Sequence, residues 1–149
     1  MAEAEAVEIL EARAALEGLA ARHAAQEADD AAVDELREII EDMRRLRQTG
    51  DLIALSNANA RLHAAILDAS GHETAKRLSR TLSSQIVRYQ YRTVLLPGRP
   101  DRSFAEHSEL VEAIAARDPD AAERAMQRHL LHVADALRID PPAARAARD

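Results

Sequence analysis

The feature of this 149-residue sequence that most limits its fold is the scarcity of residues that end helices, since it contains four glycines and five prolines. Alanine, leucine, glutamate and arginine dominate, and these side chains lose little conformational freedom in a helix. Only 2% of the residues are aromatic, and the most strand-like segment, residues 85–91, lies among apolar positions at helical spacing. The sequence therefore predicts an all-α protein.

Apolar stripes between turn signals predict six helices. The expected ranges are 4–27, 31–48, 52–69, 73–95, 104–117 and a last helix that begins at Asp118-Pro119 and continues to about 137. Short linkers favour antiparallel neighbours, so we expect a six-helix antiparallel bundle over residues 1–140 with a central cavity, followed by a disordered tail at 141–149.

Local signals indicate where several of these helices begin and end. Asp29 or Asp30 is a suitable N-cap for the second helix, and Gly50 follows its end. The segment Pro97–Pro100 is the strongest loop signal. Ser103 is the expected N-cap of the fifth helix, with Glu106 completing a capping box.

Composition excludes several classes of protein. No cysteine is present, which rules out disulfides and thiolate metal sites. A net charge of −6 argues against a nucleic-acid clamp, because phosphate binding needs a clustered basic surface. No apolar run approaches the ~20 residues that cross a membrane, and the first residues do not have the pattern of a signal peptide. We therefore expect a cytoplasmic protein with no membrane partner.

Three expected helices each carry a histidine on their apolar face, namely His63, His107 and His129. Asn59 precedes His63 by one helical turn and shares its face. Each histidine alone is more commonly a hydrogen-bonded core residue than a metal ligand. Together with Asn59 they could bind a divalent metal between facing helices, and nitrogen and oxygen ligands suit zinc, nickel, manganese, iron or cobalt. Both interpretations stay open from the residues alone.

Further polar residues are candidates for binding a ligand in the same cavity. Arg13 lies one turn from Glu17, which predicts either an ordinary helix ion pair or a buried pair near the site. An arginine that lines the cavity would suit a carboxylate, because a guanidinium binds it through two hydrogen bonds. The candidates are Arg13, Arg88, Tyr89, Arg92 and, at the edge of the cavity, His132.

Over most of its length the sequence resembles the C-terminal effector-binding (FCD) domain of GntR-family transcription regulators, in the FadR/VanR-like branch. The most specific part is the quartet Asn59, His63, His107 and His129, with separations of 4, 44 and 22 residues. Supporting segments are Arg61–Ile66, Glu106–Ile114 and Ala125–Leu130.

The resemblance implies an all-helical domain that binds a small organic acid, often at a divalent metal held by an Asp or Asn and three histidines. Zinc is the favoured metal, and Asn59 takes a position that is most often aspartate, which implies weaker metal binding. In such regulators a homodimer contacts DNA through winged helix-turn-helix domains. We expect that DNA-binding domain to be absent from this chain. Contact with DNA would then require a winged helix-turn-helix domain that this chain does not contain.

Two alternatives to the ligand sensor remain. A metal-dependent hydrolase could use the same histidines to activate water. Such an enzyme needs a general base, and the pattern places no inward carboxylate beside the histidines, because Glu106 and Glu109 lie on outward-leaning positions. The second alternative is a structural dimerisation bundle with an empty cavity. The sequence favours the non-enzymatic sensor.

Overall fold

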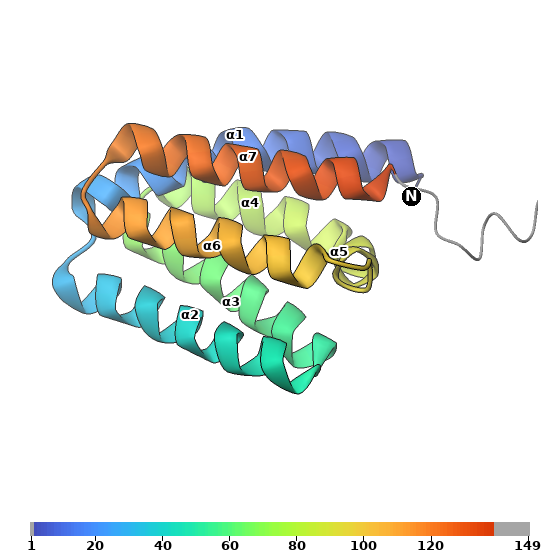
Figure 1. Cartoon of the computed structure of the whole chain (residues 1–149). Helices are drawn as coiled ribbons and strands as arrows, with labels where there is room; N and C mark the ends of the chain where they lie inside the picture. The colour runs from blue at the N-terminus through green and yellow to red at the C-terminus, as the bar shows by residue number, and fades with distance from the viewer. Residues whose placement is uncertain (1, 139–149) are drawn as a thin grey trace, which may run out of the picture.

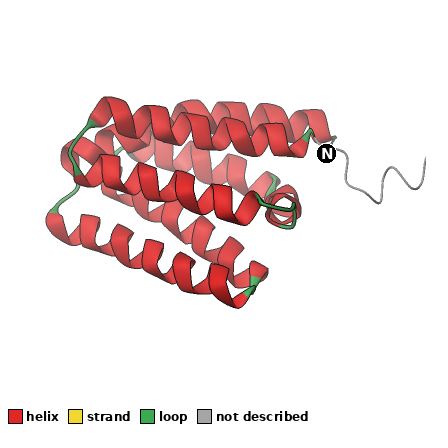
Figure 2. Cartoon of the chain, viewed as in Figure 1, coloured by secondary structure: helices red, strands yellow, loops and turns green. Residues whose placement is uncertain are grey.

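The structure is a computed structural model that describes residues 2–138, and the predicted tail at 141–149 lies outside this range. Within residues 2–138 every regular element is a helix (Figures 1 and 2), which confirms the all-α prediction. The helices are α1 Glu3–Glu27, α2 Asp30–Thr49, α3 Leu52–Ser70, α4 Glu73–Gln85, α5 Val87–Val94, α6 Arg99–Ala115 and α7 Pro119–Leu137.

Several helices begin at the predicted side-chain caps, and α2 ends at the predicted glycine. Asp29 accepts a hydrogen bond from the backbone N–H of Ala32 at 2.8 Å, which satisfies a free donor at the start of α2. Gly50 ends α2 with φ +76°, a conformation that side chains with a Cβ rarely adopt. Asp118 caps α7, and Pro119 occupies its first turn.

The helix expected over 73–95 is two helices, because the chain bends at Ile86 (φ −122°, ψ 17°) between α4 and α5. Figure 1 views α5 along its axis while the other helices run across the picture. No glycine or proline marks this bend. Ile86 is completely buried, and Tyr89 on the next turn is also buried. Core packing of these side chains outweighs the weak local preference for a continuous helix.

The capping box predicted at Ser103 and Glu106 is wrong. Helix α6 already begins at Arg99, after Gly98 at φ +77°. Pro100 lies in its first turn, where proline is favoured because its missing N–H has no helical partner. Ser103 and Glu106 therefore lie inside α6, and both side chains are free to contact histidines.

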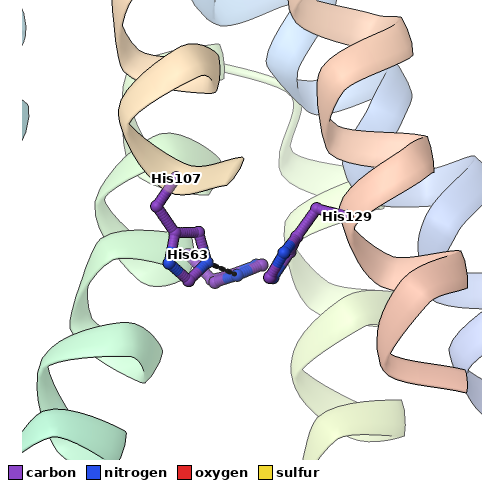
Figure 3. Close-up of side chains that lie close together, drawn as sticks. All are labelled: His63, His107 and His129. Carbon is purple, nitrogen blue, oxygen red and sulfur yellow. Dashed lines mark hydrogen bonds between the residues drawn. The ribbon is translucent and has the colours of Figure 1, made fainter. Parts of the chain in front are cut away.

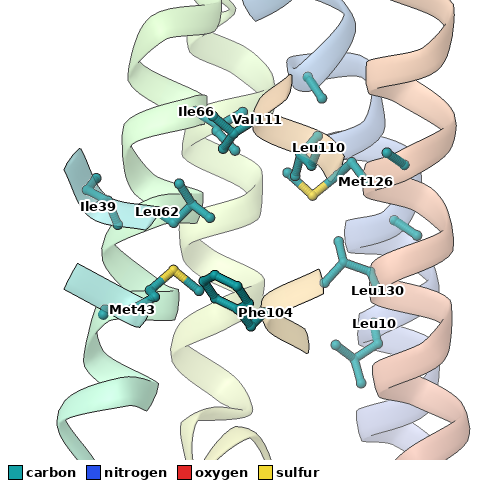
Figure 4. Packing of buried hydrophobic residues seen from close by; sticks show 14 of the residues in the cluster. Leu10, Ile39, Met43, Leu62, Ile66, Phe104, Leu110, Val111, Met126 and Leu130 are labelled. Atoms are coloured by element: carbon teal, nitrogen blue, oxygen red, sulfur yellow. The ribbon is translucent and has the colours of Figure 1, made fainter. Parts of the chain in front are cut away.

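Apart from α5, successive helices run antiparallel around one hydrophobic core (Figure 1). Helix α1 lies along α7 and also contacts α3, α4 and α6. Buried side chains of α1, α2, α3, α5, α6 and α7 meet in this core. Figure 4 shows part of it, with Leu62 and Ile66 from α3 near Leu110 and Val111 from α6. None of the described helices is long and apolar enough to cross a membrane. The core holds α3, α6 and α7 in fixed positions around the histidines.

Candidate metal centre

The three histidines predicted as ligands come together inside the bundle. Helices α3, α6 and α7 supply His63, His107 and His129, and all three side chains are buried (Figure 3). One ring nitrogen from each lies within 4.8 Å of the others. The Nε2 atoms of His63 and His107 are 3.1 Å apart. Residues separated by 66 positions in the chain therefore form one cluster of nitrogen donors.

An oxygen on the protein lies next to the other ring nitrogen of each histidine. Glu17 Oε1 is 2.7 Å from His63 Nδ1, and Glu106 Oε1 is 2.8 Å from His129 Nδ1. Ser103 Oγ is 3.5 Å from His107 Nδ1. A neutral imidazole that donates Nδ1–H to a carboxylate carries its lone pair on Nε2. Hydrogen bonds of this type fix the ring orientation and tautomer of metal-binding histidines.

The two carboxylates are ionised. Burial opposes ionisation of Glu17, but Arg13 and His63 outweigh it and lower the pKa of this carboxyl to about 2. Burial also opposes ionisation of Glu106, but its contacts with His129, His132 and Arg99 lower the pKa to about 2. Both groups therefore carry a negative charge at neutral pH and accept hydrogen bonds from the imidazoles.

At least two of the imidazoles are neutral at pH 7. Burial lowers the pKa of His129 to about 4, even though the hydrogen bond that His129 donates to Glu106 acts in the opposite direction. Burial, followed by the neighbouring His129 and His63, lowers the pKa of His107 well below its usual range. Neutral imidazoles have the free lone pair that a metal ion requires.

The His63 and His107 nitrogens have the spacing of two ligands on one divalent metal ion. Two nitrogens that each lie about 2.1 Å from one metal ion are roughly 3.0 Å apart when their bonds to the metal form a right angle, and roughly 3.4 Å apart at the tetrahedral angle. The His63 and His107 nitrogens are 3.1 Å apart, which lies in this range. Asn59 Oδ1 is buried and has no hydrogen-bond partner. This unpaired acceptor lines the same cavity, one turn from His63, and a cation would supply its missing partner.

The histidines line a cavity of about 400 Å³. Arg13 and Glu17 from α1 lie in its wall, as do Gln90 and Tyr91 from α5. The Tyr91 hydroxyl donates to Asn57 Oδ1 at 2.8 Å, which connects α5 to α3 at the exposed end of the cavity. Such a volume accommodates a small organic molecule.

Of the five predicted ligand-binding residues, Arg13 is in the cavity wall. Arg88, Tyr89 and Arg92 instead line a separate surface hollow on α5. Arg92 donates to Glu3 Oε2 at 3.0 Å and to the Leu137 carbonyl. The bend at Ile86 rotates α5, so that its other face, with Gln90, Tyr91 and Val94, meets the cavity.

His132, the fifth predicted ligand-binding residue, lies outside the cavity wall. It is exposed on α7, with Nδ1 2.6 Å from Glu106 Oε2. It therefore contacts the carboxylate that holds His129 rather than the cavity itself. His23 and His72 form an edge-to-face pair with ring centroids 5.1 Å apart.

The expectation that no inward carboxylate accompanies the histidines is wrong. Glu17 is completely buried, and Glu106 on α6 contacts His129 and His132 on α7. Glu109 does face solvent, where it pairs with Arg128. Glu106 precedes His107 and lies one turn after Ser103. Its position beside the apolar stripe of α6 indicates that its carboxylate can reach the histidines, but the predicted capping box assigned it to the start of the helix.

The fold and the cluster define a class: a helical bundle with an internal cavity whose wall contains three convergent imidazoles. The sequence matches the FCD domain over residues 8–132, so the chain belongs to the FCD domain family. This is the effector-binding domain of GntR-type transcription regulators, and it is regulatory rather than enzymatic.

Curated relatives agree with this assignment. The chain is 32% identical to the Escherichia coli protein named "Putative L-lactate dehydrogenase operon regulatory protein", over 95% of this chain and 55% of that protein. It is 30% identical to the HTH-type transcriptional regulator LutR of Bacillus subtilis, over 87% of this chain and 61% of LutR. The chain thus spans a little over half the length of these relatives.

Solved structures share the fold at lower sequence identity. Streptococcus agalactiae GntR aligns with a TM-score of 0.74 and 21% identity, over 87% of this chain and 58% of that one. Escherichia coli McbR/YncC aligns with a TM-score of 0.79 and 19% identity, over 87% of this chain and 62% of that one. These similarities support the all-helical architecture.

Proposed function

We propose that this domain senses a small carboxylate effector at a divalent metal ion held by His63, His107 and His129, with Asn59 as a fourth and weaker ligand. The observation that carries the proposal is the direction of the imidazoles. Their Nδ1 atoms face protein oxygens, and the Nε2 atoms of His63 and His107 face each other at 3.1 Å, where a metal ion would take the place of the hydrogen bond between them. Zinc is the metal we favour, with nickel, manganese, iron and cobalt as alternatives.

The bound metal would supply a positive centre at which a carboxylate oxygen can bind. The chain's own residues supply the rest of the recognition. Arg13 offers a buried guanidinium nitrogen, Nη1, that has no hydrogen-bond partner, and a carboxylate is the strongest neutral-pH acceptor for it. The cavity volume of about 400 Å³ limits the effector to a small molecule. One relative carries L-lactate in its name, so L-lactate is a rational first compound to test.

For the whole regulator we propose a cytoplasmic homodimer that contacts DNA through winged helix-turn-helix domains. Binding of the effector would change how the dimer presents these domains to DNA. The family membership and the names of the relatives support this proposal. The hydrolase alternative has less support, because Glu17 and Glu106 are engaged in holding imidazoles and arginines. A general base must instead face the reacting water.

Titration of the metal-free protein with Zn²⁺ by isothermal calorimetry tests the metal ligands. We expect one site per chain, with at least about 100-fold weaker binding in His107→Ala and in His129→Ala, because each loses one of three nitrogen ligands. His23→Ala is the matched control, since His23 is half-buried on α1 away from the cavity wall. Unchanged Zn²⁺ affinity in both cluster variants, with helical circular dichroism intact, would refute the assignment.

Thermal denaturation of the zinc-loaded protein tests the effector. L-lactate and a series of small mono- and dicarboxylates should include compounds that raise the melting temperature, because a ligand that binds the folded state stabilises it by mass action. The same compounds should have a smaller effect on the metal-free protein. A complete series without any shift would count against a carboxylate effector and leave the structural bundle as the better interpretation.

A further inference from the structure

Arg13 lines the cavity and is connected to the candidate metal centre through Glu17. Its Nε donates to Glu17 Oε2 at 2.6 Å, and Glu17 Oε1 is 2.7 Å from His63 Nδ1. The side chains of Arg13 and Glu17 are 3% and 0% exposed. A continuous buried path thus leads from the guanidinium through one carboxylate to a predicted metal ligand.

The other side of the same guanidinium lacks a partner. Arg13 Nη1 is buried without a hydrogen bond, and Arg13 lines the cavity. A buried donor without an acceptor costs about 1–3 kcal/mol, and more when it is charged. An anionic oxygen in the cavity would satisfy this donor through a charge-assisted hydrogen bond. The path therefore ends at the cavity wall on a donor that an anion would satisfy.

We propose that Arg13 binds an anionic group of the effector and that Glu17 couples this anion to the metal ion on His63, so that anion and metal bind cooperatively. The inference rests on the proposed function, because it requires a metal at the histidines. It assigns a separate role to Glu17, which touches neither ligand and acts as a positioning residue.

The sign of the coupling follows from the order of charges. Anion, Arg13 cation, Glu17 carboxylate and metal cation alternate in sign along the path, and His63 joins the last two by donating to Glu17 and binding the metal. An anion on Nη1 draws positive charge from the Arg13–Glu17 pair, so Glu17 becomes a stronger acceptor for His63 and the imidazole becomes a better metal ligand. The anion thereby strengthens metal binding, and by reciprocity the metal strengthens anion binding by the same factor.

The structure contains a second path that serves as an internal comparison. Arg99 Nη2 donates to Glu106 Oε1 at 2.7 Å, and the same oxygen is 2.8 Å from His129 Nδ1. Among the described arginines, the buried nitrogen without a partner belongs to Arg13 and not to Arg99. Glu106 is also shared with the exposed His132. This second path holds the predicted ligand His129, and Arg99 also lines the cavity, so Glu106 provides the matched comparison for Glu17.

The test is calorimetric titration of the metal-free protein with Co²⁺, with and without acetate as the probe anion. In the wild type we expect acetate to tighten Co²⁺ binding about 5-fold or more. Glu17→Gln and Glu106→Gln should both weaken Co²⁺ binding, by about 10–100-fold. The acetate effect should persist in Glu106→Gln and fall below about 2-fold in Glu17→Gln.

Arg13→Lys provides a second test that does not remove the buried counter-charge. Its ammonium can pair with Glu17 but lacks the planar set of donors that serves Glu17 and an anion together. We expect the ratio of the Co²⁺ affinities measured with and without acetate to fall to about 1 in this variant. This variant decides the question if Glu17→Gln does not fold.

Two results would overturn the coupling while leaving the proposed function intact. One is Co²⁺ binding at the histidines with no acetate effect in the wild type. The other is a full wild-type acetate effect in Arg13→Lys, which would mean that acetate acts by contacting the metal directly. Absence of Co²⁺ binding to the wild type would instead overturn the proposed metal site and, with it, the coupling.

Discussion

Replacing Glu17 with glutamine should be among the most destabilising single changes in this protein. The Glu17 carboxylate is completely buried, and its two oxygens contact Arg13 and His63 at 2.6 and 2.7 Å. A glutamine amide has nearly the same shape but cannot neutralise Arg13. Leaving one partner of a buried ion pair uncompensated costs about 3–5 kcal/mol, which is a large part of the ~5–15 kcal/mol that stabilises a typical domain.

Urea denaturation of the metal-free protein, followed by circular dichroism, measures this cost. The informative comparison is the double variant Arg13→Met/Glu17→Gln, which removes the unpaired charge and keeps an amide oxygen for the His63 N–H. We expect the double variant to recover roughly 2 kcal/mol or more relative to Glu17→Gln, because an apolar side chain replaces a buried cation. A double variant no more stable than the single one would refute the argument that an uncompensated charge causes the loss.

Three further predictions concern the metal-free protein. Burial lowers the pKa of His129 to about 4 from its ordinary 6.5, so the unfolded chain binds the proton at a higher pH than the folded chain does. The free energy of unfolding should therefore fall as the pH is lowered from about 6.5 towards 4. Urea curves that do not change over this range would contradict a neutral His129. Leu62→Ala should cost about 2–5 kcal/mol in urea denaturation, since Leu62 is completely buried, whereas Ile53→Ala, at an exposed position, should change stability by less than about 0.5 kcal/mol. Gly50→Ala should lower the unfolding free energy by about 1 kcal/mol because of its φ of +76°, and an unchanged midpoint would show that the backbone tolerates alanine there.

Local patterns were sufficient to predict the helical class and the cluster of three histidines. Each of His63, His107 and His129 interrupts an apolar stripe, and a stripe that faces the core also fixes the direction of any polar residue on it. Helix caps such as Asp29 and Asp118 depend on short-range hydrogen bonds and were predictable for the same reason.

The remaining parts of the site depend on tertiary packing. The bend at Ile86 carries no glycine or proline signal, and it decides which face of α5 meets the cavity. Arg88 and Arg92 therefore lie outside the cavity wall although their spacing suggested otherwise. The role of Glu106 depends on the distance between α6 and α7, which the spacing of residues within one helix does not determine.

The metal content of protein purified without a chelator or a polyhistidine tag tests the central claim most directly. Elemental analysis should find about one equivalent of a divalent metal per chain, with zinc as the favoured ion, and His107→Ala/His129→Ala should lose it while keeping its helix content. Less than about a tenth of an equivalent in the wild type, together with no thermal shift when zinc, nickel or manganese is added, would contradict the account.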